Sequence, residues 1–210
     1  MRVDLHVHAS ERSGCSVSGE EEIIRAAIDF GLDGLAFTDH QVLVPAARLT
    51  ELNAKFAPFR IFSGIEIHTI EEEDVLVIGV NDPRLEKRAW NYPALYEFVR
   101  DRAGFLAIAH PFRYREKVNI DFEDRVPDAL EGASFNIRPE RELLIRNLAE
   151  QLGCRLMCSS DAHFYDYVGL CRLVLDGNPA NNEELVRLLR SGAYQCETDE
   201  DRMARARAGL

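Results

Sequence analysis

The chain opens with Val3-Asp4-Leu5-His6-Val7-His8, a stretch in which apolar and polar side chains alternate. Alternation with a period of two predicts a β-strand, because successive side chains of a strand point to opposite faces. His6 and His8 are therefore expected on one face of this strand, together with Asp4. A helical pattern follows the strand, and this order of elements is typical of an α/β protein.

Strands and helices continue to alternate along the chain. The helix after the first strand is expected to begin at Ser18, which would form a capping box with Glu21, and to end before Gly31. Further strands are expected at residues 34–39, 59–67, 75–80, 105–109, 129–135, 155–159 and 170–175, and further helices at 45–56, 92–103, 139–152 and 182–190. The polar stretch 113–128 has no clear period and is expected to form a long loop.

This order predicts parallel strands with helices outside them. About seven or eight strands in one domain favour a closed or nearly closed barrel, with a doubly wound open sheet as the alternative. A single domain over residues 1–210 is expected, because the chain shows no linker, internal repeat or low-complexity segment. We expect the charged tail from Glu197 to be loosely docked.

The composition narrows the class of protein. Hydrophobic residues make up 46% of the chain and charged residues 29%, which is typical of a globular protein and excludes a disordered or collagen-like one. The net charge of −11 disfavours binding of long nucleic acids. No apolar run approaches the roughly 18 residues that span a bilayer, so no membrane association is expected. The amino terminus lacks the apolar segment of a secretory signal, and a cytoplasmic location is expected.

The cysteine pattern agrees with a reducing compartment. The five cysteines are widely spread, and their number is odd: Cys15, Cys154, Cys158, Cys171 and Cys196. A chain of this length does not need disulfides to be stable, so all five are expected to be free thiols.

Histidines and carboxylates gather where the predicted strands end. They are His6 and His8, Asp39 and His40, Glu66 and His68, His110, and Asp161 and His163. Because the carboxyl ends of parallel strands meet at one rim, we expect most of these side chains to converge there. Imidazole and carboxylate ligands without paired thiolates suit zinc, manganese or iron. Taken singly, His68 is better interpreted as a hydrogen-bonded surface residue.

Five ordered motifs resemble those of the PHP (polymerase and histidinol phosphatase) superfamily. They are Asp4-Leu5-His6-Val7-His8, Thr38-Asp39-His40, Gly64-Ile65-Glu66-Ile67, Ala109-His110-Pro111 and Ser160-Asp161-Ala162-His163. The resemblance spans residues 3 to about 175. It implies a distorted (β/α)7 barrel with two or three divalent metal ions at the carboxyl-terminal rim of the strands.

The resemblance also implies which residues bind each metal. A first metal would take His6, His8, Glu66 and Asp161. A second would share Glu66 and take His110 and Asp74. A third would take His40, His163 and a residue of the loop 9–15, where many members have aspartate or histidine. This loop contains neither, so Glu11 or Cys15 would have to substitute.

The function implied is hydrolysis of a small phosphomonoester by a metal-activated water, in which Glu66 and Asp161 act as ligands. His40 or His163 would assist the leaving group. Arg113 is a candidate phosphate clamp, although it could instead be solvated or paired with Glu116, and Arg138 is a weaker second candidate. The alternatives are a phosphodiesterase or nuclease acting on nucleotides or short oligonucleotides, and a metal-binding domain without catalytic activity. The sequence leaves the substrate, the native metal and the oligomeric state open.

Overall fold

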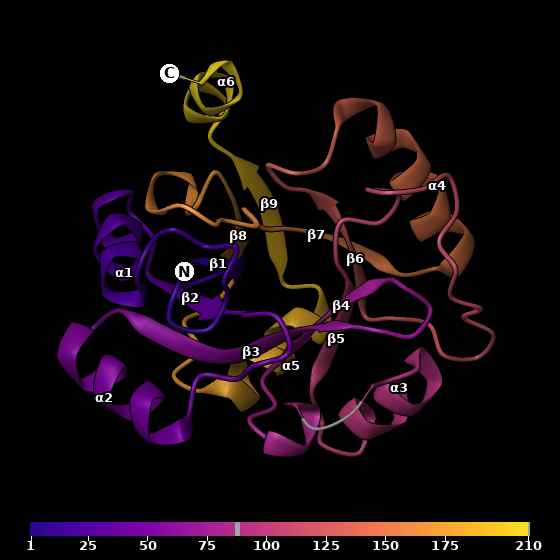
Figure 1. The fold of residues 1–210 in the computed structure, drawn as a ribbon, viewed down its shortest axis with the longest axis horizontal. Coiled ribbons are helices and arrows are strands. Elements are labelled where there is room, and N and C mark those ends of the chain that lie inside the picture. Colours follow the sequence, from indigo (N-terminus) through magenta and orange to yellow (C-terminus); the bar gives the residue numbers. More distant parts are fainter. Residues whose placement is uncertain (87–88, 210) are drawn as a thin grey trace.

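The computed structural model describes residues 1–86 and 89–209. Lys87, Arg88 and Leu210, which the sequence assigns to the same domain, lie outside the described residues. One sheet of nine strands forms in the described part of the chain, in the order β7-β6-β5-β4-β3-β2-β1-β8-β9. Figure 1 shows the strands around a common centre with most of the helices outside them.

Most elements follow the sequence prediction closely in position, but the last strand and the last helix were not predicted. The strands are β1 (Arg2–Val7), β2 (Gly34–Phe37), β3 (Arg60–His68), β4 (Asp74–Ile78), β5 (Phe105–Ile108), β6 (Ala129–Ala133), β7 (Arg155–Cys158), β8 (Cys171–Leu175) and β9 (Tyr194–Thr198). The helices are α1 (Glu20–Asp29), α2 (Ala46–Phe56), α3 (Tyr92–Arg100), α4 (Glu142–Leu152), α5 (Asn182–Ser191) and α6 (Glu200–Ala208), with short 3₁₀ turns η1 (Pro83–Glu86), η2 (Pro139–Arg141) and η3 (Tyr165–Tyr167). No regular element lies between β5 and β6, as expected for the loop 113–128.

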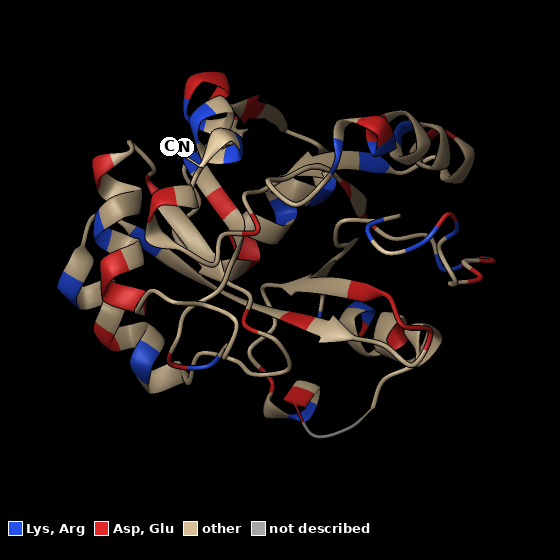
Figure 2. Ribbon diagram, turned by 45° about the horizontal axis from the view of Figure 1, so that its top comes forward, with Lys and Arg blue, Asp and Glu red and all other residues tan. Residues whose placement is uncertain are grey.

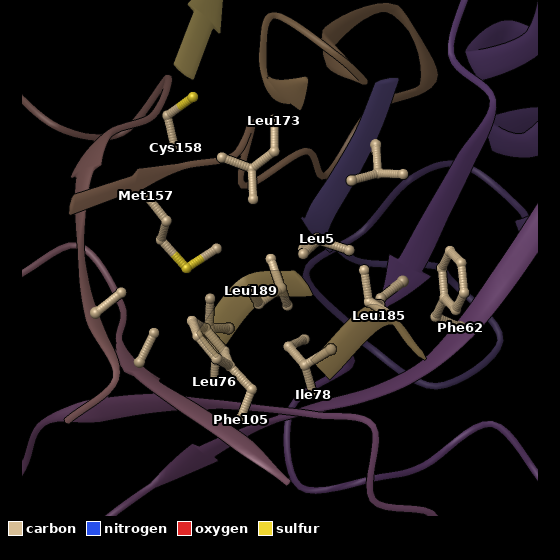
Figure 3. Packing of buried hydrophobic residues seen from close by; sticks show 14 of the residues in the cluster. Leu5, Phe62, Leu76, Ile78, Phe105, Met157, Cys158, Leu173, Leu185 and Leu189 are labelled. Atoms are coloured by element: carbon tan, nitrogen blue, oxygen red, sulfur yellow. The ribbon is translucent and has the colours of Figure 1, made fainter. Parts of the chain in front are cut away.

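The sheet curls into a nearly closed α/β barrel, which confirms the expected fold class and excludes the doubly wound open sheet. The hydroxyl of Tyr194 on β9 donates to the carbonyl of Leu156 on β7, so the two edge strands lie close together. Helix α5 packs into the barrel interior through Leu185 and Leu189, which Figure 3 shows among side chains from several strands. These apolar contacts fill one end of the barrel.

Not all strands are parallel, which corrects the sequence prediction. Strand β4 is antiparallel to both β3 and β5, and β8 and β9 form an antiparallel pair in which β8 is also antiparallel to β1. The reason lies in the connection between β3 and β4, which is the tight turn 69–73 closed by the Thr69 amide on the Glu73 carbonyl. So short a connection cannot cross over the sheet, and it forces a hairpin.

Strand β1 is interrupted by a register shift. In the pairing with β2, Asp4 lies opposite Leu35 and Val7 lies opposite Phe37. Strand β1 therefore has one more residue than β2 between these two pairs. Leu5 therefore packs in the barrel interior, whereas Val7 packs outside with Phe37. His6 and His8 reach the interior, but Asp4 does not join them. Its carboxylate instead accepts bonds from the Ser160 hydroxyl and the Gly169 amide.

The start of α1 also differs from the prediction. Ser18 caps nothing in this helix, because its hydroxyl accepts a hydrogen bond from the Tyr165 amide at 3.0 Å. The cap comes from Glu11, whose two carboxylate oxygens accept from the Glu20 amide at 3.1 and 3.0 Å. A carboxylate is favourable there because the amino end of a helix carries partial positive charge.

The chain after Glu197 is docked rather than loose, which corrects the prediction for the tail. The last residues of β9 continue its pairing with β8, and α6 follows at once. Met203 on α6 is buried, and Arg202 donates to the carbonyls of Asp166 and Val168 at 2.7 and 3.1 Å.

All five cysteines are free thiols in this structure. Among the described residues, no helix is both long enough and apolar enough to cross a bilayer.

Candidate metal centre

The end of β1 and the segment after β7 meet at one rim of the barrel. The amide of His8 donates to the carbonyl of Ala162 at 2.9 Å, and the amide of Ala162 donates to the carbonyl of His6 at 3.3 Å. This parallel pairing closes the barrel between two strands that are not neighbours in the sheet. It places Asp161 and His163 directly beside the two histidines of β1.

Four side-chain atoms converge inside this rim. They are His6 Nε2, His8 Nε2, Glu66 Oε2 and Asp161 Oδ1. Each histidine nitrogen lies 3.2–3.5 Å from each of the two carboxylate oxygens, and all four residues are buried. Four ligands about 2.1 Å from a metal ion in tetrahedral geometry lie about 3.4 Å apart. The spacing therefore suits one transition-metal ion.

None of these four atoms has a hydrogen-bond partner among the described residues. Buried polar atoms nearly always have partners, because leaving one unsatisfied costs about 1–3 kcal/mol. His40 Nδ1 comes within 2.8 Å of Glu66 Oε2, but not in hydrogen-bond geometry. A divalent cation would satisfy all four atoms at once. The residues expected for a first metal thus fit such an ion by position and by chemistry.

A second group forms around the other oxygen of Glu66. His110 Nε2 lies 3.1 Å from Glu66 Oε1 and 3.9 Å from Asp74 Oδ2. Ligand atoms of these three residues lie within 4.8 Å of one another, close enough to hold a further ion. Asp74 reaches the rim because β4 is antiparallel to β3, so that its first residue pairs with His68 at the carboxyl end of β3.

His68 has a specific role in this group. Its Nδ1 lies 2.7 Å from Asp74 Oδ1, while Asp74 Oδ2 faces His110. His68 is exposed, as the sequence suggested, and the structure adds that it orients a candidate ligand. Such outer partners fix the direction of a ligand toward its metal.

The third group is less complete than the resemblance implies. His40 and His163 both contact the His8 ring, at centroid distances of 4.4 and 4.3 Å, and their own centroids are 6.1 Å apart. The three residues offer ligand atoms within 4.8 Å of one another. Glu11 is not available to this group, because its carboxylate caps α1. Cys15 is exposed and is not part of the group. Among the described residues, neither expected substitute therefore completes a third site.

Opposite charges in the rim balance one another strongly. Burial alone would raise the pKa of Glu66, but the facing His6, His110 and His40 hold that pKa well below its usual range. Burial would lower the pKa of His6, and the carboxylates of Asp161, Glu131 and Glu66 instead raise it well above the ordinary value. The same competition between burial and Glu66 raises the pKa of His110. In the metal-free centre, protonation of His6 and His110 is thus favoured, and it supplies positive charge that a metal ion would otherwise supply.

Glu131 on β6 belongs to the centre although it is not among the predicted site residues. It is fully buried, and its Oε1 lies 3.0 Å from His6 Nδ1 and accepts from the Ser159 hydroxyl at 2.5 Å. Its Oε2 accepts from the His110 amide at 2.8 Å. When the ring of His6 is neutral and Nδ1 donates to Glu131, the lone pair of Nε2 faces the other three orphaned atoms. A charged residue inside the predicted strand 129–135 is the sequence signal that points to it.

Two side-chain hydrogen bonds hold the Asp161 carboxylate, and its backbone is strained. Its other carboxylate oxygen, Oδ2, accepts from Asn136 Nδ2 at 2.7 Å and from Arg113 Nη1 at 3.1 Å. Its backbone has a φ of 53°, in the left-handed region that non-glycine residues seldom adopt. Such strain persists only where surrounding contacts enforce it, and it is often found at functional sites.

The two candidate phosphate-binding arginines differ in their surroundings. Arg113 lies at the centre and is partly exposed. It does not pair with Glu116, which forms two hydrogen bonds with Arg141 instead. Arg138 is exposed just before η2, and its side chain makes no hydrogen bond or ion pair with any described residue.

A PHP-associated family model matches residues 140–194 of the chain, a segment that includes Asp161 and His163. No curated protein matches the chain significantly in sequence. The fold, however, resembles several solved structures.

PsfC from Pseudomonas syringae PB-5123 superimposes with a TM-score of 0.71 at 18% identity, over 99% of this chain and 95% of that one. A two-domain protein from Bacteroides vulgatus, containing a predicted PHP-like metal-dependent phosphoesterase, gives 0.71 at 13% identity, over 94% of this chain and 64% of that one. The lesion-specific endonuclease PfuEndoQ from Pyrococcus furiosus gives 0.65 at 15% identity, over 93% and 58%. The family-model match and the PHP-like fold confirm the resemblance to the PHP superfamily that the five motifs indicate.

Proposed function

We propose that the protein is a metal-dependent phosphoesterase that hydrolyses a small phosphomonoester. The observation that carries this proposal is the convergence of four orphaned ligand atoms beside a second histidine–carboxylate group. Glu66 contributes Oε2 to the first group and Oε1 to the second. One carboxylate thus fixes the spacing between two candidate ion positions.

The donor set suits zinc, manganese or iron, and two such ions would polarise a phosphoryl oxygen and lower the pKa of a bound water. His6, His8, Glu66 and Asp161 would hold one ion, and Glu66, His110 and Asp74 the other. We propose two ions rather than three, because Glu11 is engaged at α1 and Cys15 lies outside the third group.

The remaining residues bind the substrate and move a proton. Arg113 donates to Asp161 through Nη1 alone, and its Nε and Nη2 have no hydrogen-bond partner among the described residues. A guanidinium with two free donors can hold a phosphate in a planar fork. The side chains of His40 and His163 are 44% and 26% exposed, whereas His8, which contacts both, is buried. Either of the two exposed imidazoles could donate a proton to the leaving alkoxide.

Phosphodiester hydrolysis is the second candidate, because the endonuclease from Pyrococcus furiosus has the same fold. Figure 2 shows both acidic and basic residues on α1, α2 and α6 rather than a purely basic stretch. With a net charge of −11, the chain favours a small phosphorylated substrate over a long nucleic acid. We also propose that it acts in the cytoplasm.

Two measurements test this proposal. Elemental analysis of the purified protein should find zinc, manganese or iron at about two ions per chain. The metal-loaded protein should then hydrolyse 4-nitrophenyl phosphate faster than bis(4-nitrophenyl) phosphate. Faster turnover of the diester would favour the phosphodiesterase. A metal-loaded protein that hydrolyses neither ester would be a binding domain without catalytic activity.

Arg113→Ala tests the phosphate clamp. Loss of a charge-assisted hydrogen bond of about 1.5–3 kcal/mol should lower kcat/KM by roughly tenfold to a hundredfold, and should weaken inhibition by inorganic phosphate. Metal content should stay unchanged. Arg113→Lys should recover only part of the loss, because an ammonium lacks the planar fork. Arg146→Ala on the exposed face of α4 is the matched control. Unaltered phosphate inhibition in Arg113→Ala would exclude the clamp.

A further inference from the structure

Large exposed apolar residues occur on several segments that leave the rim of the metal centre, and we call the surface formed by these segments its mouth. Six such residues are exposed in the described part of the chain: Val17, Ile28, Val42, Ile70, Tyr114 and Leu143. Four of these, Val17, Val42, Ile70 and Tyr114, lie in the segments that follow β1, β2, β3 and β5. Those are the segments that leave the rim where the candidate ligands converge.

The backbone of these segments is tied to the rim itself. The Val17 amide donates to the carbonyl of His163, and the side chain of Gln41, next to Val42, donates to the carbonyl of His68. Ile70 lies two residues after His68. The segments that carry these four residues therefore leave the same rim of the barrel. Exposed apolar side chains beside a buried polar centre are typical of a ligand-binding surface.

Tyr114 is the aromatic member of this set and the one closest to the proposed chemistry. Its ring lies edge-on to the His110 ring at a centroid distance of 6.3 Å, and the Arg113 guanidinium lies 5.1 Å from its centroid. Arg113 in turn contacts Asp161 at 3.1 Å. A phosphate held by Arg113 would therefore have the Tyr114 ring beside it, on the side open to solvent, where 70% of this residue is exposed.

The loop that carries Tyr114 is fastened on both sides. Arg115 donates to Glu72 at 2.8 Å, and Asn119 donates through its amide to Glu73 at 2.9 Å, which joins the loop to the β3–β4 turn. Glu116 is paired with Arg141 at the start of α4. An aromatic side chain on an anchored loop offers a preorganised surface, so less conformational entropy is lost when a ligand binds.

We propose that this mouth binds the alcohol part of the substrate, and that the substrate class is a phosphomonoester of an aromatic alcohol whose ring stacks on Tyr114. The inference rests on the proposed function for the phosphate end of the ligand. Aromatic pairs in offset or edge-to-face contact favour each other beyond simple burial, by about three- to tenfold in affinity. Val17, Val42 and Ile70 would contact the same apolar group from the other segments of the rim.

The test uses phosphonates, which bind like phosphate esters but cannot be hydrolysed. Titration calorimetry on the metal-loaded protein would compare benzylphosphonate, cyclohexylmethylphosphonate and ethylphosphonate. We expect benzylphosphonate to bind at least about threefold more tightly than the cyclohexylmethyl compound of similar size. Tyr114→Ala should abolish this preference and leave ethylphosphonate affinity unchanged, and Tyr114→Phe should keep it. Ile28→Ala, which removes an exposed apolar side chain of α1, is the matched control.

The outcomes separate this inference from the proposed function. Equal affinity for the benzyl and cyclohexylmethyl compounds, or a preference that survives Tyr114→Ala, would overturn the stacking role even if phosphate esters are hydrolysed. A Tyr114-dependent preference without hydrolysis of any ester would support the ligand class and overturn only the proposed reaction. Failure of all three phosphonates to bind would overturn both.

Discussion

The two ends of the barrel interior are built from the same strands, but one end is apolar and the other is polar. Strand β3 contributes Phe62 to one end and Glu66 to the other, and β4 contributes Ile78 and Asp74 in the same way. The apolar end is complete without any partner, because its side chains pack against one another and against α5. The polar end is incomplete, since four of its buried atoms have no hydrogen-bond partner in the described part of the chain. One end thus stabilises the fold, and the other requires a ligand.

This comparison predicts that the two ends respond separately to change. A substitution at the apolar end should alter stability with little effect on metal content. A conservative substitution at the polar end should alter metal binding with little effect on the fold. Distant sites that share no partners usually behave additively, so the two responses can be measured independently.

Glu66→Gln should have the largest effect. The amide keeps the shape of the side chain, but it removes the charge and cannot readily bridge two ions. Metal content should fall by at least one ion per chain, and kcat should fall by roughly 10³ or more, the scale of losing a key electrostatic element. Elemental analysis and turnover of 4-nitrophenyl phosphate measure the two effects, with Glu22→Gln on the exposed side of α1 as control. Full metal content with near-normal turnover would show that Glu66 does not bridge two ions.

Leu76→Ala tests the opposite end. Leu76 is fully buried beside Phe105 and Leu189 (Figure 3), and its truncation should lower the free energy of unfolding by about 2–5 kcal/mol. Denaturant unfolding measures this loss, and Leu143→Ala on the exposed face of α4 should change stability by no more than about 0.5 kcal/mol. Metal content per folded chain should be unchanged. A loss of metal from folded Leu76→Ala would show that the two ends are coupled.

Glu131→Gln should weaken metal binding by about 10- to 100-fold, the usual effect of removing an outer partner of a ligand histidine. If the amide oxygen still accepts from His6 Nδ1 and the Ser159 hydroxyl, the amide NH2 faces the His110 backbone amide, which is also a donor. In the opposite orientation the NH2 faces His6 Nδ1 and the bond to His6 is lost. Competition with a chelator of known affinity measures the change, and the absorption spectrum of bound Co²⁺ reports on ligand geometry. The metal-free variant should melt close to the metal-free wild type. An unchanged affinity and Co²⁺ spectrum would reduce Glu131 to a structural residue.

The smallest expected effect is that of pH on the metal-free protein. The raised pKa of His6 and of His110 means that their protons stabilise the fold fully below the ordinary pKa of 6.5. This contribution is lost as pH rises through the raised values, so the metal-free protein should become less stable above about pH 6.5. Metal affinity should instead rise with pH, up to about tenfold per unit for each proton displaced. Thermal melting with and without metal should show opposite trends, and parallel trends would contradict the assigned charge balance.

The sequence alone predicts the elements that depend on local patterns. Period-two runs locate the strands, amphipathic runs locate the helices, and Gly153 ends α4 with a φ of 65° as expected. The histidines at the strand ends predict a converging set of ligands, because the geometry of parallel strands carries every carboxyl end to one rim. The strands and helices are predicted correctly because each depends on side-chain direction within a single element, and the side chains at the strand ends converge once the strands lie side by side.

Predictions that depend on a choice between distant partners needed the structure. Glu11 could bind a metal or cap α1, and the fold brings its carboxylate to the helix end. Ser18 could cap α1 or accept from Tyr165, and it accepts from Tyr165. Both residues have several suitable partners in the sequence. Only the packing of α1 against its neighbours decides which partner lies within reach.

The tertiary structure also decides the composition of the polar end. Asp74 reaches it because the short turn 69–73 makes β4 antiparallel, and Glu131 reaches it because β6 lies between β5 and β7. The sequence therefore determines the type of fold and the chemistry of the strand ends. The orphaned atoms, the outer partners and the apolar mouth come from long-range contacts, because residues far apart in the chain become neighbours only when the barrel closes.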